Sequence, residues 1–476
     1  MSTIHETSLR RLPANELPPR RFVEQNISME TSAPASSATL KRTLSLWDLI
    51  LYGVIVIQPT APMSIFGVLS ERGRGHVVTA ILIAMVAMLF TAVSYGRMAR
   101  AYPSAGSAFT YVGQEIHPAL GYITGWSMVM DYMLNPLICT IWCAQQANAF
   151  APGVPVVVWK IFFAGIFTVL NLRGVKTSAR INAGMAAGMG AVITVFFVAA
   201  ARYICGHPHD PAFFTRPFYD PQTFSTSAVF GCTSIAVLTY IGFDGISTLS
   251  EEAENPRRNI LLATVLTCLV IGILSAIEVY AAQLIWPASE PFPNVDTAFV
   301  YVAGRALPIL FAVVGFTLLV ANFGSGMGAQ LGASRLLYAM GRSNALPRSF
   351  FGTVEPKRHI PRNSVLFVGV IALIGSFLLT FALGAEMLNF GALIAFMGVN
   401  AAAFVRYFLR EKEKKITNFF LPLAGFLICL GLWLNLSRPA KIAGGAWMLA
   451  GIAFGAWKTR GFRGELVNFD LPPEEA

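Results

Sequence analysis

Residues 239–258 read TYIGFDGISTLSEEAENPRR, and this stretch decides the fold. It continues an apolar run that begins near Ser227, yet it contains Gly-Phe-Asp-Gly at positions 242–245. Glycine leaves the backbone flexible, and aspartate favours turns and helix N-caps over helix interiors. The sequence therefore predicts an apolar helix that is broken at residues 240–245.

The composition places this helix in a lipid bilayer. The chain has 476 residues, of which 55% are hydrophobic and 13% are charged. Soluble domains carry roughly a quarter of charged residues, and a membrane-spanning helix needs about 20 consecutive, mostly apolar residues. Such segments recur along almost the whole chain, which predicts an all-α polytopic membrane protein.

Twelve apolar segments lie between two polar tails. They cover residues 45–70, 77–99, 118–148, 154–172, 182–204, 226–250, 259–286, 306–340, 363–383, 386–408, 417–436 and 441–458. We expect residues 1–42 to form a disordered tail, residues 43–460 the twelve-helix membrane domain, and residues 461–476 a second polar tail.

The distribution of basic residues predicts the orientation of the chain. If the N-terminus is cytoplasmic, the inner loops hold eighteen Lys and Arg residues, and the outer loops hold far fewer, among them Arg72, Arg74, Arg202, Arg216, Arg438 and Lys441. Cytoplasmic loops carry the excess of basic residues, so both termini are expected in the cytoplasm, with the chain in the cell (inner) membrane. The net charge of +10 thus reflects topology and does not indicate a nucleic-acid partner.

The first segment is also interrupted. Residues 53–70 read GVIVIQPTAPMSIFGVLS, with Pro59 and Pro62 three positions apart. An interior proline removes a backbone donor and costs about 3 kcal/mol in a helix. The two prolines should unwind a turn around Gln58 and Thr60, with Pro62 at the first position of a second half-helix.

The two breaks predict an inverted repeat and a small polar cavity. Each break opens a set of five segments, residues 43–205 and 226–408, and residues 417–458 add two more. Because five is odd, the second set enters the membrane from the opposite face, as in secondary transporters. Irregular backbone at membrane depth persists only against protein or a water-filled cavity. Two simpler readings remain open: prolines also kink ordinary helices, and Asp244 could serve only as an N-cap.

Besides Asp244, two carboxylates lie well inside apolar segments. Asp131 lies in the third segment on one helical face with Thr124, Ser127 and Asn135. Such an acid is expensive in lipid and marks a function or a bond to a neighbouring helix. Glu278 in the seventh segment is a second candidate, or it reaches the outer surface. Either acid is a candidate proton carrier.

Other polar residues carry weaker signals. Glu251 and Glu252 follow the sixth segment and could form a gate with inner-loop arginines, or stay solvated.

The run CGHPHD at residues 205–210 matches no zinc-ligand spacing, so we interpret it as a loop and expect no metal or other cofactor. Since the chain contains neither a GxxxxGK[ST] phosphate loop nor an HExxH helix, no enzyme activity is indicated.

Several longer motifs resemble those of the amino acid–polyamine–organocation permeases. They are YIGFDGISTLSEEAENPRRNI at 240–260, SYGRMARAYPSAGSAFTYV at 94–112, NLRGVKTSARIN at 171–182 and ASRLLYAMGRSNALP at 333–347. Within this superfamily GWSMVMDY (125–132), FDGISTLSEE (243–252) and LNFGALIAFMGVN (388–400) most resemble the putrescine-importer branch.

The resemblance implies a LeuT-type fold of five plus five inverted helices and transport by alternating access. It also implies that residues of both breaks bind the substrate, with Phe243 as an aromatic lid. These residues are Gln58, Pro59, Thr60, Ala61, Pro62, Met63, Ser64, Tyr240, Gly242, Phe243, Asp244 and Gly245. We add Asp131, identified above, to the candidate substrate-binding residues. Three positions depart from the family. The glycine-rich turn that holds a substrate carboxylate is missing from the first break, the acid of the putrescine-like relatives falls at Ser64, and a lysine of some proton-coupled members falls at Met189.

The sequence therefore predicts a secondary transporter that imports an amino acid or related amine, with H⁺ as the coupling ion. A polyamine importer, an exchanger and a nutrient sensor remain as alternatives. The expected partners are the small-molecule substrate and membrane lipid.

Overall fold

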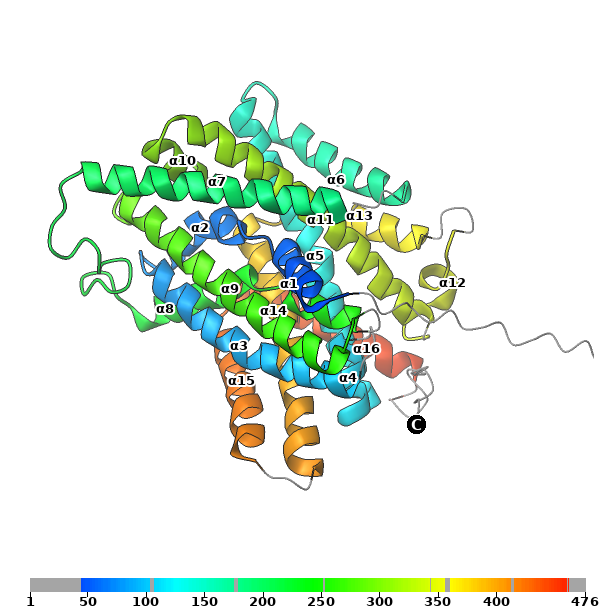
Figure 1. Cartoon of the computed structure of the whole chain (residues 1–476). Coiled ribbons are helices and arrows are strands. Elements are labelled where there is room, and N and C mark those ends of the chain that lie inside the picture. Colours follow the sequence, from blue (N-terminus) through cyan, green and yellow to red (C-terminus); the bar gives the residue numbers. More distant parts are fainter. Residues whose placement is uncertain are drawn as a thin grey trace, which may run out of the picture. The chain divides into compact units, whose positions relative to one another are not determined.

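The computed structural model of the chain consists of helices joined by turns and short loops (Figure 1). It describes residues 44–102, 107–174, 179–250, 253–342, 344–355, 360–411, 415–459 and 461. Within these residues β-structure is limited to two isolated bridges. Helices satisfy their own backbone hydrogen bonds, which a segment in hydrocarbon requires.

The helices occupy the predicted segments. In chain order they are α1 (Leu46–Ile57), α2 (Ala61–Arg72), α3 (Val77–Ala101), α4 (Ser107–Glu115), α5 (Pro118–Phe150), α6 (Val156–Leu172), α7 (Ala179–Gly206), α8 (Thr226–Ala236), η1 (Val237–Thr239), η2 (Phe243–Leu249), α9 (Pro256–Ile285), α10 (Ala298–Ala306), α11 (Ile309–Arg342), α12 (Arg348–Phe351), α13 (Arg362–Leu378), α14 (Phe381–Phe404), η3 (Val405–Arg410), α15 (Ile416–Leu434) and α16 (Arg438–Lys458).

Two features of this order differ from the prediction. The helices α4 and α10 are additional, and at nine residues each they are too short to register as apolar membrane segments. The boundary between the ninth and tenth segments lies at Leu379–Thr380 rather than at 383–386. The reason is a cap: the Thr380 hydroxyl accepts a hydrogen bond from the backbone N–H of Leu383 at 3.2 Å, which starts α14 early.

The predicted break in the first segment is confirmed. The helix α1 ends at Ile57, α2 begins at Ala61, and the two are bent by 43°. Gln58 has φ +69°, a left-handed conformation that non-glycine residues rarely adopt. Pro59 follows this residue directly, and the chain unwinds for one turn. Pro62 is the second residue of α2 rather than the first, because the helix already begins at Ala61, whose N–H donates to the Gln58 carbonyl.

The predicted break in the sixth segment is confirmed as well, although its second half differs in type. The helix α8 tightens into η1, turns at Tyr240–Gly242, and continues as the 3-10 helix η2 instead of an α-helix. Gly242 has φ +124°, which is accessible to glycine and strained for other residues. Residues 251 and 252, the predicted gate acids Glu251 and Glu252, lie outside the described residues.

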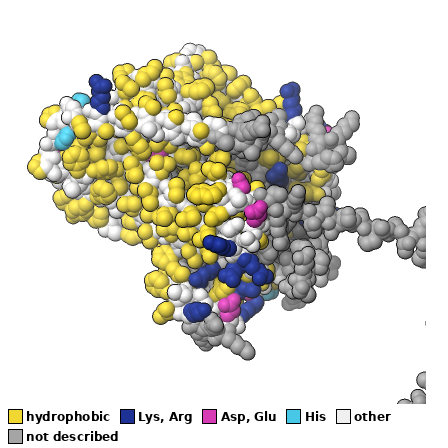
Figure 2. Space-filling model, viewed as in Figure 1, with side chains coloured by type: hydrophobic (Ala, Val, Ile, Leu, Met, Phe, Trp, Pro, Cys, Tyr) yellow, Lys and Arg dark blue, Asp and Glu magenta, His cyan; other side chains and the backbone are white. Residues whose placement is uncertain are grey.

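Exposed apolar side chains cover the outside of the helices. Figure 2 shows hydrophobic side chains over most of the visible face, with Lys and Arg gathered in its lower part. On α9 the exposed residues Leu266, Val270, Ile273 and Ile277 recur at helical spacing, three of them 48% exposed. Soluble proteins rarely expose such a continuous stripe, so this face is suited to lipid.

Among the described residues, seven helices are long and apolar enough to cross a membrane, and the bent pair α1–α2 makes an eighth. The helices α6 and α13 are also apolar but are shorter than 18 residues. This number of long apolar helices indicates an integral multi-pass membrane protein. The number of twelve membrane crossings stays a prediction.

A charge cluster around a buried carboxylate holds α4 against η3, which continues α14. The Glu115 side chain is fully buried, and it forms ion pairs with Arg406 at 2.6 Å and Arg410 at 2.9 Å. It also accepts a hydrogen bond from the Tyr102 hydroxyl at 2.7 Å. Burial and this hydrogen bond raise the pKa of Tyr102 to about 12, so the phenol remains a donor at neutral pH.

We expect Glu115→Gln to lower the free energy of unfolding by about 2–3 kcal/mol, because two arginines lose a buried carboxylate. Unfolding in detergent by titration with SDS measures this. The matched control is Asp210→Asn, which removes an ion pair to Arg216 whose side chains are about half exposed; its cost should stay below about 1 kcal/mol. Equal costs for both variants would show that the Glu115 cluster contributes no more than a surface pair.

Candidate functional site

The first break is fixed to its neighbours by side-chain hydrogen bonds. Gln58 Nε2 donates to the backbone oxygen of Ala321 on α11 at 2.6 Å. One residue further along α11, Asn322 Nδ2 donates to Ser64 Oγ at 2.9 Å. The indole of Trp142 on α5 donates to the Ser64 carbonyl at 3.1 Å. Residues 58–64 therefore lie between α11 and α5 in a defined conformation.

The remaining residues of this break are buried. Thr60 is 1% exposed and Met63 2%, while Pro59 and Pro62 are also buried and Ala61 is partly exposed. The Thr60 hydroxyl lies 3.7 Å from the sulfur of Met189 on α7. Met189, the position that the family resemblance aligns with a lysine, thus adjoins the first break and presents an uncharged thioether there.

The second break is organised by Asp244. One carboxylate oxygen accepts a hydrogen bond from the backbone N–H of Gly242 at 3.2 Å, and the other accepts one from the Tyr132 hydroxyl of α5 at 3.3 Å. The residue at the N-cap of η2 is Gly242 and not Asp244. Asp244 nevertheless stabilises the turn by bonding back to Gly242, and its side chain connects the break to α5.

The two breaks are in direct contact. A Cβ atom placed on Gly242 would lie 3.1 Å from Val56 Cγ1 and 3.2 Å from Ile57 Cγ1, at the end of α1. A Cβ atom on Gly245 would lie 3.9 Å from the Tyr52 hydroxyl oxygen. The structure therefore brings together two segments that are about 180 residues apart in the sequence.

Asp131 lies beside the second break with an unsatisfied carboxylate. It is 5% exposed, and it interacts electrostatically with Asp244. Among the described residues no hydrogen bond or ion pair to this carboxylate is present. Its polar neighbours on α5 are already bonded, since Thr124 and Ser127 donate to carbonyls of their own helix and Asn135 accepts from Cys139. Of the four aligned polar residues, Asp131 is the one with no side-chain hydrogen bond among the described residues.

An aromatic cluster surrounds Phe243. This ring is fully buried and packs against Tyr95 at 5.6 Å and Phe396 at 5.3 Å between ring centroids. The hydroxyls of Tyr95 and Tyr111 are buried and have no hydrogen-bond partner among the described residues. Sequence reasoning did not single out these tyrosines, although both fall in the motif at residues 94–112.

Two predicted site residues lie apart from this cluster or point away from it. The Tyr240 hydroxyl donates to the Ile81 carbonyl of α3 at 2.8 Å, which leaves only the backbone of Tyr240 for a ligand.

Glu278 on α9 is fully buried, so the alternative that it reaches the surface is wrong. Both of its carboxylate oxygens lack a hydrogen-bond partner among the described residues, and no electrostatic interaction joins it to Asp131 or Asp244.

Two pockets open at opposite ends of α9. One of about 430 Å³ is lined by Arg100, Arg257, Arg258, Leu261 and Leu262. The other, of about 240 Å³, is lined by Ser70, Glu71, Ala288, Ser289, Glu290, Pro291 and Phe292. Neither pocket is lined by residues of the two breaks. The break residues themselves are almost all buried.

Comparison with known proteins identifies the family. Residues 59–450 match the family model described as amino acid permease. The chain is 34% identical to the low-affinity putrescine importer PlaP of Escherichia coli strain K12 over 455 residues, which covers 93% of this chain and 99% of that protein.

More distant relatives carry other substrate names. The chain is 27% identical to the branched-chain amino acid permease BcaP of Bacillus subtilis strain 168, covering 90% of this chain and 96% of the relative. It is 26% identical to the methylthioribose transporter of the same bacterium, covering 86% and 91%. These relatives are transporters. With the helix content and the matched range, they show that this chain is an integral membrane protein that belongs to the amino acid permease family.

Proposed function

We propose that the protein is a secondary active transporter that imports an amino acid or a related amine by alternating access, coupled to protons. The observation that carries this proposal is the contact between two broken helices beside the unpaired carboxylate of Asp131. Secondary transporters bind their solutes at such breaks near the middle of the membrane. The proposal includes twelve crossings in five-plus-five inverted repeats, with both termini in the cytoplasm.

We place the substrate between residues 58–64 and residues 240–245, next to Asp131. The end of α1 presents carbonyl oxygens, which favour a positively charged group. The start of α2 offers few amide donors, because Pro62 has none and the N–H groups of Ala61 and Met63 donate to the Gln58 and Thr60 carbonyls, each at 3.1 Å. The geometry thus supports recognition through an ammonium group, which amino acids and diamines share, more than through a carboxylate.

Proton coupling follows from the same chemistry. A carboxylate that is buried without a partner is unfavourable in its charged form, so it takes up a proton or binds a cation. Asp131 meets this condition next to the breaks, and Glu278 meets it within α9. We therefore assign proton exchange to these two acids. Phe243 is the proposed lid, and Glu251 and Glu252 are the proposed inner gate.

Ser64 provides a test of substrate class. The acid of the putrescine-like relatives falls at this position, and Ser64 Oγ already accepts a hydrogen bond from Asn322. We expect Ser64→Asp to raise the uptake of a diamine relative to a neutral amino acid by about tenfold, because one added ion contact is worth about 1.4 kcal/mol or more. The uncharged control Ser64→Asn should not change this ratio. A similar change in both variants would exclude a charge effect.

Uptake into proteoliposomes tests the proposed function. Purified protein is reconstituted, an inward proton gradient is imposed, and labelled putrescine and a panel of amino acids are supplied. Accumulation that collapses with a protonophore supports a proton-coupled importer. Uptake that needs a solute loaded inside would replace this proposal with an exchanger, and no uptake of any solute under either condition would replace it with a sensor.

A further inference from the structure

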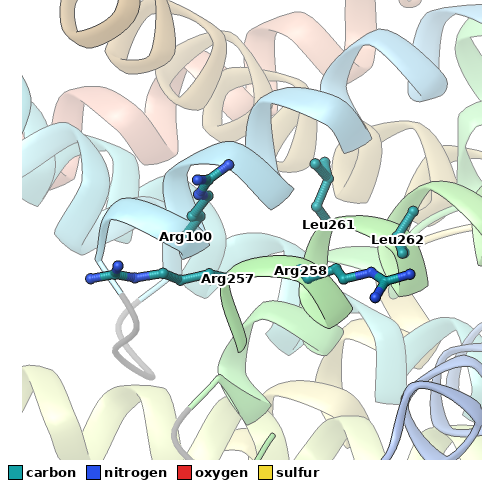
Figure 3. Close-up of a pocket in the computed structure, with 5 residues that line it drawn as sticks. All are labelled: Arg100, Arg257, Arg258, Leu261 and Leu262. Carbon is teal, nitrogen blue, oxygen red and sulfur yellow. The ribbon is translucent and has the colours of Figure 1, made fainter. Parts of the chain in front are cut away.

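The pocket of about 430 Å³ lies beside a close approach of α3 and α9. A Cβ atom on Gly96 would lie 2.6 Å from Leu261 Cα, so the glycine allows the two backbones to touch. One helical turn beyond this contact, Arg100 projects from the last turn of α3, and Arg257 and Arg258 project from the first turn of α9. Figure 3 shows Arg257 and Arg258 extending in opposite directions, with Arg100, Leu261 and Leu262 above them in the view.

Among the described residues, these arginines have no anionic partner. No side-chain hydrogen bond or ion pair joins Arg100, Arg257 or Arg258 to a residue in that part of the chain, and all three are exposed. Other arginines at this end of the molecule are engaged: Arg406 and Arg410 bind Glu115. Three uncompensated guanidinium groups around a pocket of about 430 Å³ favour an anion.

The apolar side of the pocket continues along α9. From Leu262 the stripe runs through Leu266, Val270, Ile273 and Ile277, each on the same helical face and the last four exposed. At 1.5 Å per residue this stripe extends over much of the roughly 30 Å hydrocarbon core. The arginines therefore lie at the end of a lipid-facing stripe, at the level where head groups meet acyl chains.

We propose that this pocket binds the head group of an anionic phospholipid. The phosphodiester contacts Arg100, Arg257 and Arg258, and an acyl chain lies along Leu262, Leu266 and Val270. Free phosphate shares the charge chemistry but gains nothing from the apolar stripe. The site is separate from the proposed transport site, because none of its lining residues belongs to either break.

Native mass spectrometry of the full-length protein in detergent tests the site. The probes are phosphatidylglycerol, phosphatidylcholine with the same acyl chains, and inorganic phosphate. The test variant is Arg100→Gln/Arg257→Gln/Arg258→Gln. The control Arg342→Gln/Arg348→Gln/Arg362→Gln removes the same charge from arginines that are also predicted to be cytoplasmic but do not line the pocket.

Wild type should retain phosphatidylglycerol in preference to phosphatidylcholine. The pocket variant should bind phosphatidylglycerol about 100-fold more weakly, since each arginine near a membrane surface contributes about fivefold, and the control should change binding by less than about threefold. Equal retention by wild type and the pocket variant, or equal losses in both variants, would overturn the proposal. So would displacement of the lipid by millimolar phosphate. If the triple variant does not fold, Arg100→Gln and Arg258→Gln are measured singly, with about fivefold expected for each.

Discussion

Asp131→Asn is expected to lower solute uptake at least about 100-fold while the protein remains folded. Asparagine keeps the size of the side chain but removes the charge that would hold a substrate ammonium or a proton. Loss of one partner from a buried, hydrogen-bonded charge pair costs about 2–5 kcal/mol, or a factor of about 30 to several thousand in affinity. Initial rates in proteoliposomes measure the effect.

The stability of the same variant separates function from structure. In the absence of substrate the Asp131 carboxylate has no hydrogen-bond or ion partner among the described residues, so its replacement by a neutral amide should leave the unfolding midpoint unchanged or raise it. The control Ser127→Ala lies one turn away on the same face of α5, where its hydroxyl bonds only to its own helix at the Thr124 carbonyl. Its uptake should stay within about threefold of wild type. Wild-type transport by Asp131→Asn would show that transport does not require this carboxylate.

Gly242→Ala is expected to damage both stability and transport. The φ of +124° at this position is strained for any residue with a Cβ atom, and the added methyl would press on Val56 and Ile57 at the tip of α1. Strain of this kind costs about 1–3 kcal/mol. Because the contact joins the two breaks, we expect uptake to fall by about tenfold or more.

The control for this variant is Gly431→Ala in α15. A Cβ atom there would meet nothing within 4 Å, and alanine is about 1 kcal/mol better than glycine inside a helix. This variant should be as stable as wild type or more so, with unchanged uptake. If Gly242→Ala retained wild-type stability and uptake, the two breaks would not depend on their close contact.

The positions of the breaks could be predicted from the sequence because their causes are local. Two prolines three residues apart cannot sit in one straight helix, and Gly242 permits a turn that other residues resist. The partners of the breaks could not be predicted. Gln58 bonds to Ala321, 263 positions away, and such pairings depend on how all the helices pack.

The same limit applies to the candidate site. Helical periodicity correctly aligned Asp131 with Thr124 and Ser127, but it could not tell that the two hydroxyls bond to their own helix. Local propensity also did not predict the 3-10 geometry of η2 or the packing of Phe243 against Tyr95 and Phe396, which come from distant parts of the chain. Tyr95 carries no signal of its own inside an apolar segment.

The most direct measurement is a cryo-EM structure of the protein in lipid nanodiscs with a saturating concentration of the solute that it transports. We expect the solute to contact residues 58–64 and 240–245, with its ammonium group within hydrogen-bond distance of Asp131 or Asp244. A solute bound elsewhere, with both breaks packed against protein alone, would show that the broken helices do not form the transport site.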